Sequence, residues 1–101
     1  MSRRVMDGIE PEIVDEVRDT VGAVAGVRDA TDLRVRWHGH QLRVAVSISV
    51  DPGISVEAGH QIAHEVEHAL HHQFSSPIST VVHVEPYGLD DAHLIADHHR
   101  R

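Results

Sequence analysis

The stretch AHEVEHALHH contains the pattern H-E-x-x-H, formed by His64, Glu65 and His68. On a helix this spacing places two imidazoles one turn apart, and in zinc hydrolases the glutamate between them acts as the general base. The first interpretation that these residues allow is therefore a small zinc hydrolase. Whether the pattern can do this chemistry depends on which face of its helix the two histidines occupy.

Histidine is the unusual component of this chain, with eleven among 101 residues. Cysteine is absent, which excludes thiolate metal sites, disulfides and thiol catalysis. The formal net charge of -7 and the scattered arginines argue against a nucleic-acid partner. No run approaches the ~20 apolar residues that span a bilayer. Imidazole and carboxylate groups are therefore the candidates for metal or proton chemistry.

The first half of the chain predicts a helix followed by a β-hairpin. A helix is expected to begin at Pro11, because proline is favoured in the first helical turn, and to end at Gly26. Alternating apolar residues then predict two strands, in ATDLRVRWHG and LRVAVSISV. Gly39 and His40 are expected to form the tight turn between them.

The second half predicts another helix and a third strand. Ser55 is a predicted N-cap, and an apolar arc through Ile62, Val66 and Leu70 follows it. The strand STVVHVEP is expected to end at Pro86. Residues 1–101 then form one α+β domain with a core of about 8–87, in which two helices pack on one face of a small antiparallel sheet. Residues 88–101 read equally well as a tail or as a short helix.

The histidines of the second helix occupy the side opposite its apolar arc. His60, His64, His68 and His71 all fall there, so the H-E-x-x-H histidines face away from the domain's own core. A zinc hydrolase needs them to point into a cleft with a third ligand. We therefore expect a solvated or partner-facing surface rather than a catalytic site.

His83 and Glu85 are two residues apart on the third strand. Alternate residues of a strand project from the same face, so the imidazole and the carboxylate share a face with Val81. A single strand histidine is usually structural, held by one hydrogen bond. The pair nevertheless supplies half of a nitrogen and oxygen site for Zn²⁺ or a similar ion.

The segments SVDPGISVEAGHQIAHEVEHALHHQF and TVVHVEP resemble the cytoplasmic C-terminal domain of the cation diffusion facilitator transporters. The opening RVMDGIEPEIVDEVRDTVGAVAGV and the DLRVRWHG after it also match, so the resemblance covers Met6 to about Pro86. It implies an αββαβ ferredoxin-like, metallochaperone-like sandwich with a three-stranded sheet. It also implies a non-enzymatic, metal-sensing homodimer attached to a cell-membrane domain that exchanges divalent cations for protons.

The resemblance also implies the metal ligands. His60, His83 and Glu85 match family ligand positions, whereas Ser47 and Thr31 stand where the family often has further ligands. Water or other side chains could substitute, and the remaining candidates are Asp32, His38, His40, His64, His68 and His71. The donor set suits Zn²⁺ best, with Co²⁺, Ni²⁺, Fe²⁺, Cd²⁺ and Mn²⁺ also compatible.

Three other interpretations stay open at this point. The chain, which lacks a membrane segment, is expected to be either an excised domain or a free-standing relative that buffers metal. An interaction module without metal is the second alternative, and the zinc hydrolase is the third.

Overall fold

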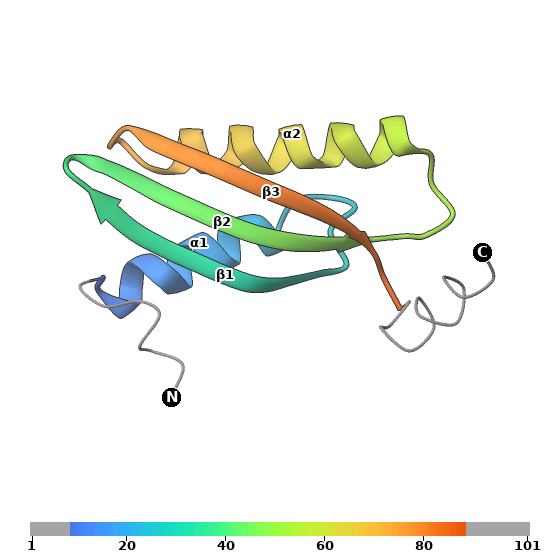
Figure 1. The fold of residues 1–101 in the computed structure, drawn as a ribbon, viewed down its shortest axis with the longest axis horizontal. Helices are drawn as coiled ribbons and strands as arrows, with labels where there is room; N and C mark the ends of the chain where they lie inside the picture. The colour runs from blue at the N-terminus through green and yellow to red at the C-terminus, as the bar shows by residue number, and fades with distance from the viewer. Residues whose placement is uncertain (1–8, 89–101) are drawn as a thin grey trace, which may run out of the picture.

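The computed structural model describes residues 9–88. These residues form two helices and three strands in the predicted order (Figure 1). The elements are α1 (Pro11–Gly22), β1 (Asp29–His38), β2 (Gln41–Val50), α2 (Val56–Gln73) and β3 (Ile78–Pro86). The choice between a tail and a short helix concerns residues 89–101, which lie outside the described residues. No helix of residues 9–88 is long and apolar enough to cross a bilayer.

The three strands form one sheet in the order β1-β2-β3, with β2 in the centre. β1 and β2 are the predicted antiparallel hairpin, but β2 and β3 run parallel. The expectation of an antiparallel sheet was therefore wrong for β3. The reason is that α2 carries the chain back along the sheet, so β3 starts beside the beginning of β2, as in a βαβ crossover.

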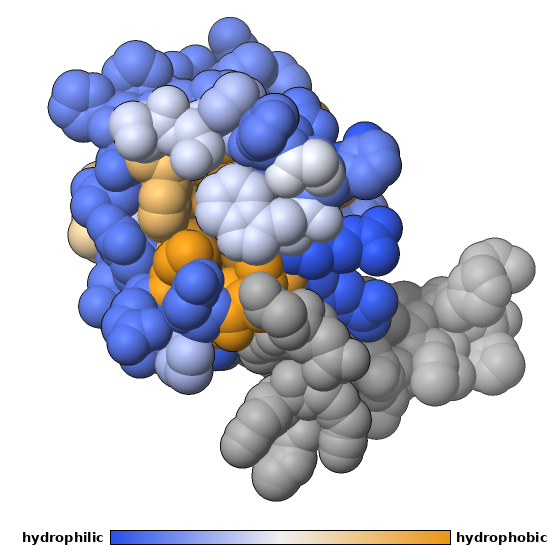
Figure 2. Space-filling model, turned by 90° about the vertical axis from the view of Figure 1, so that its left-hand side faces the viewer, coloured by the Kyte–Doolittle hydropathy of each residue, from blue (hydrophilic) through white to orange (hydrophobic). Residues whose placement is uncertain are grey.

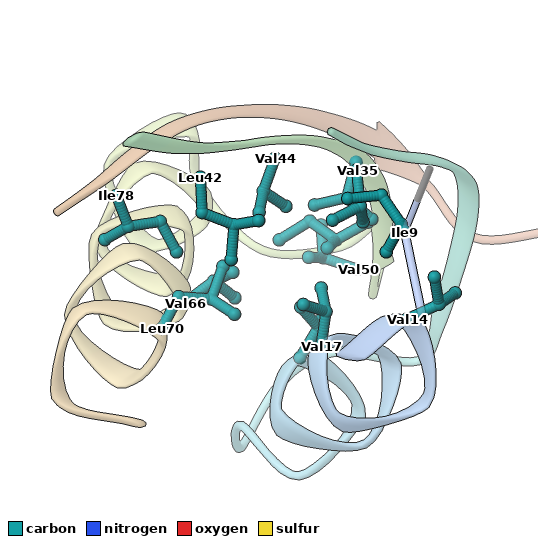
Figure 3. Close-up of a cluster of buried hydrophobic side chains, with 13 residues drawn as sticks. Ile9, Val14, Val17, Val35, Leu42, Val44, Val50, Val66, Leu70 and Ile78 are labelled. Carbon is teal, nitrogen blue, oxygen red and sulfur yellow. The ribbon is translucent and has the colours of Figure 1, made fainter. Parts of the chain in front are cut away.

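The hydrophobic core lies between the sheet and the two helices, which cover the same face (Figure 3). β2 confirms the predicted alternation, since its inward residues are all buried. The buried apolar residues are Ile9, Val14, Val17, Val21, Val35, Leu42, Val44, Val46, Ile48, Val50, Val66, Leu70 and Ile78. Within the described part of the chain, no helix covers the opposite face of the sheet.

The helix ends follow the sequence signals with one exception. Ser55 is the N-cap of α2, because its hydroxyl accepts a hydrogen bond from the Ala58 N–H at 3.0 Å. α1 begins at Pro11 as predicted, but it ends at Gly22, earlier than Gly26. Gly26 instead adopts a φ of +97° in the following turn, where a Cβ would lie 2.6 Å from Ile62 Cδ1. It therefore lets that turn pass close to α2.

The two outer strands are irregular at particular points. The register of β1 shifts between Thr31 and Arg34, and Asp32 between them has a φ of +51°. β3 follows Pro77 and ends at Pro86. The end of β3 is held against β2 by the Tyr87 N–H, which donates to the Val50 carbonyl at 2.7 Å.

Candidate metal centre

A groove of about 430 Å³ lies where the N-terminal end of α2 meets the end of β3. We call it the α2–β3 groove. His60 of α2 and Glu85 of β3 both line it, as does Asp51 of the loop between β2 and α2. Its apolar lining includes Ile54 and Val84. Two of the three predicted metal ligands therefore share one groove.

Local turns of the chain position this groove. The Asp51 carboxylate accepts a hydrogen bond from the Gly53 N–H at 2.9 Å, which stabilises a tight turn in the loop between β2 and α2. Ser55 then starts α2, and His60 follows in the second helical turn. Asp51 was not among the predicted site residues. Its only sequence signal is its place directly after a buried strand, at the same end of the sheet as the last residues of β3.

His83 lies beside the groove but is not one of its lining residues. It is in register with Ser47 of β2, while Glu85 is in register with Ser49. His83 and Glu85 are both exposed, on the strand face that they were predicted to share. Ser47, which stands where a further ligand was sought, is only 7% exposed and pairs with Thr31 on its other side.

The described part of the chain does not assemble a complete three-ligand site. Among residues 9–88, no three histidine, aspartate or glutamate side chains are placed so that they could hold one metal ion. His60 and Glu85 share the groove, and His83 faces outward from the adjacent sheet surface. The set of His60, His83 and Glu85 therefore stays a prediction.

The histidines of α2 are exposed, as expected, but they do not all behave alike. The Nε2 atoms of His60 and His64 lie 3.0 Å apart, and the two rings meet edge to face with centroids 4.5 Å apart. His68 instead stacks on His72, with centroids 6.5 Å apart and planes at 13°. The two H-E-x-x-H histidines therefore contact different neighbours, His60 and His72.

The other predicted metal ligands lie outside the α2–β3 groove. His38 and His40 are exposed at the β1–β2 turn. By the register of the sheet, this turn is about 20–23 Å from His83 along the strands. Seen from the turn end, the surface is hydrophilic around its rim and exposes a hydrophobic patch near its middle (Figure 2). The Asp32 carboxylate forms an ion pair with Arg34 at 3.2 Å, and His71 is exposed on α2.

The chain is similar to curated cation efflux proteins over most of its length. It is 34% identical over 84 residues to a probable cation efflux system protein of Mycobacterium tuberculosis, which is 83% of this chain and 25% of the relative. It is 30% identical over 79 residues to the manganese efflux system protein MneP of Bacillus subtilis, which is 78% of this chain and 27% of that protein. The chain thus spans about a quarter of the length of the curated relatives that it matches.

The chain is also similar to solved structures of cation efflux protein domains. The cadmium form of the MamM CTD superposes with a TM-score of 0.70 at 28% identity, over 75% of this chain and 95% of that one. A nickel form of the MamM CTD gives a TM-score of 0.69 at 30% identity, over 74% of this chain and 96% of that one. These likenesses confirm the ferredoxin-like sandwich. The family described as the cytoplasmic domain of cation efflux proteins matches residues 9–87, and this chain therefore belongs to that family, the cation diffusion facilitators.

Proposed function

We propose that this chain is the dimerising, metal-sensing domain of a transporter that exports a divalent cation in exchange for protons. In this proposal a membrane domain of the same transporter is its covalent partner, and a second copy is its non-covalent one. A metal ion held by His60, His83 and Glu85 favours a closed dimer, in which the two copies lie closer together than in the metal-free, open dimer. The observation that carries the proposal is the division of these residues between a groove and the adjacent open sheet face.

The incomplete ligand set is the argument for a second copy. Protein zinc sites use three or four ligands, and of the three predicted ligands two, His60 and Glu85, line the common groove, where Asp51 lies with them, while His83 does not. A two-fold axis presents the same patch twice, so the groove of one copy can meet His83 of the other. The sheet face that carries His83 has no helix over it in residues 9–88, which leaves it free for such a contact.

Charge gives the metal a regulatory effect. Each copy carries a formal charge of -7, so two copies repel at short range, over roughly 8–10 Å at physiological salt. A divalent cation between them would neutralise part of this repulsion and bridge the chains. It shifts the equilibrium only if it binds the closed dimer more tightly than the open one.

We propose Zn²⁺ as the sensed ion. Two imidazoles and one carboxylate are typical zinc ligands. Mn²⁺ is the main competitor, because MneP is a manganese efflux system protein, while the MamM CTD has cadmium and nickel forms. Nitrogen ligands favour Zn²⁺ over Mn²⁺ in the general affinity order of divalent metals. Parallel calorimetric titrations with the two ions test this choice.

The proposal is tested by the oligomeric state and the shape of the chain. Sedimentation velocity should show a homodimer that Zn²⁺ strengthens, and distances between spin labels on the two copies should shorten with Zn²⁺. His83→Ala should remove both effects, whereas His40→Ala, at the distant turn, should retain them. A chain that stays monomeric at high concentration with and without Zn²⁺ contradicts dimerisation. Identical distances in the two conditions contradict the switch, even where the metal binds.

A further inference from the structure

We infer that His60 and His64 form a two-histidine clamp that binds a divalent transition-metal ion within a single chain. We call this pair the α2 clamp. Its two Nε2 atoms are 3.0 Å apart. Among residues 9–88, this is the one pair of histidines whose ring nitrogens lie within hydrogen-bond distance of each other. The clamp needs no second copy and does not depend on the proposed dimer, with which it shares only His60.

The separation of the two nitrogens fits one common metal ion. With zinc–nitrogen bonds of about 2.0–2.1 Å, two nitrogens lie about 3.4 Å apart at a tetrahedral angle and about 2.9 Å apart at a right angle. The observed 3.0 Å falls between these values, so a small rotation of the rings would let both lone pairs meet at one ion. The two open sides of the ion would face water, because both histidines are exposed.

The helix fixes the two ligands before any metal arrives. His60 and His64 are four residues apart, which places them on the same side of α2 in successive turns. Ser55 caps this end of the helix, and Val66 is completely buried against the sheet. The backbone that carries the clamp is therefore ordered by contacts that do not involve the histidines, and metal binding does not have to fold it.

A carboxylate supports the required form of His64. Its Nδ1 lies 3.7 Å from Glu67 Oε1, so a proton on Nδ1 faces a negative charge. A carboxylate at this position favours the tautomer that leaves the Nε2 lone pair free for a metal. With its hydrogen on Nδ1, His64 accepts at Nε2, and the His60 Nε2–H is then the donor of the 3.0 Å contact. Metal binding requires the His60 ring to carry its hydrogen on Nδ1 instead, which frees both Nε2 lone pairs.

The same helix contains its own control. His68 is also one turn from His64, and it belongs to the H-E-x-x-H pattern. Its ring stacks on His72, whereas the Nε2 of His64 lies against that of His60. Geometry therefore separates His60 and His64 from the other exposed histidines of α2. As an all-imidazole pair, the clamp should prefer Zn²⁺, Ni²⁺ and Co²⁺ over Mn²⁺.

The test is a zinc titration of the full chain against a chromophoric chelator, at a protein concentration where sedimentation shows monomer. His64→Gln should weaken zinc binding at least about tenfold, since even loss of a supporting residue costs this much in many sites. His68→Gln should bind as the natural chain does. In nitrogen-detected NMR, zinc should shift the Nε2 signals of His60 and His64 together and leave His68 unchanged.

Two outcomes overturn the clamp. One is an unchanged zinc affinity in His64→Gln. The other is a loss of zinc affinity in His68→Gln as large as that in His64→Gln, which would mean diffuse binding to a histidine-rich surface. The proposed dimer site fails on a different measurement, the response of dimerisation to His83→Ala. The two sites also compete for the imidazole of His60. His64→Gln should therefore leave zinc-induced dimerisation intact or move it to lower zinc concentration.

Discussion

The packing of α2 against β3 at Gly59 predicts that Gly59→Ala stabilises the fold. Gly59 is buried in the first turns of α2, and a Cβ there would lie 3.5 Å from Val84 Cγ1 and 3.9 Å from Ile54 Cδ1. Both are ordinary contact distances, so the methyl group fits without displacing a neighbour. Alanine gains about 0.5–1 kcal/mol over glycine inside a helix. Burial of one more carbon adds about 0.8 kcal/mol.

The sum predicts an increase of about 1–2 kcal/mol in the free energy of unfolding, or roughly 5–15 °C in Tm for a domain of this size. Urea unfolding followed by circular dichroism measures it. Gly26→Ala is the matched control and should lower stability by about 1–2 kcal/mol, because the left-handed φ of +97° is costly for alanine and the methyl group would press on Ile62. A Gly59→Ala variant that is less stable than the natural chain would refute the described packing of α2 on β3.

Three further substitutions test other parts of the structure. Ser55→Ala should lower the free energy of unfolding by about 1 kcal/mol, because the Ala58 N–H loses its acceptor; thermal unfolding measures this, and an unchanged Tm would contradict the cap. Leu70→Ala should cost about 2–5 kcal/mol, since Leu70 is fully buried; urea unfolding checks it, and a cost below 1 kcal/mol, roughly that of a surface change, would contradict the core. In a zinc-supplemented peptidase assay, the natural chain and Glu65→Gln should both show only background activity. Peptidase activity in the natural chain that Glu65→Gln abolishes would instead support the zinc hydrolase.

Much of the fold could be predicted from side-chain patterns along the chain. The alternation in β2 and the capping serine of α2 are local signals, and both are confirmed. The direction of β3 could not be obtained in this way, because side chains alternate in the same manner in parallel and antiparallel strands. It depends on the crossover through α2, which is a property of the whole topology. The early end of α1 has a local cause, since Gly22 weakens the last turn before Gly26 is reached.

The candidate site was predictable only in part for a similar reason. Periodicity placed His60 on the outer side of its helix and put His83 and Glu85 on one strand face, and all three are exposed there. Periodicity does not give distances between elements. It therefore could not reveal that Glu85 shares a groove with His60 and Asp51 while His83 does not. It also could not distinguish the contact of His60 with His64 from the stacking of His68 on His72.

The irregularities of the outer strands affect how copies of this domain can associate. The register shift between Thr31 and Arg34 interrupts one edge of the sheet, and Pro77 and Pro86, which lack an N–H, flank the other. Such edges are poor templates for a strand from another molecule, which disfavours domain swapping and amyloid-like growth. In the proposed dimer, the two copies would then meet through side chains instead of a continuous ladder of backbone hydrogen bonds. The strength of that proposed association would depend on a few ligands and charges, which an ion can alter.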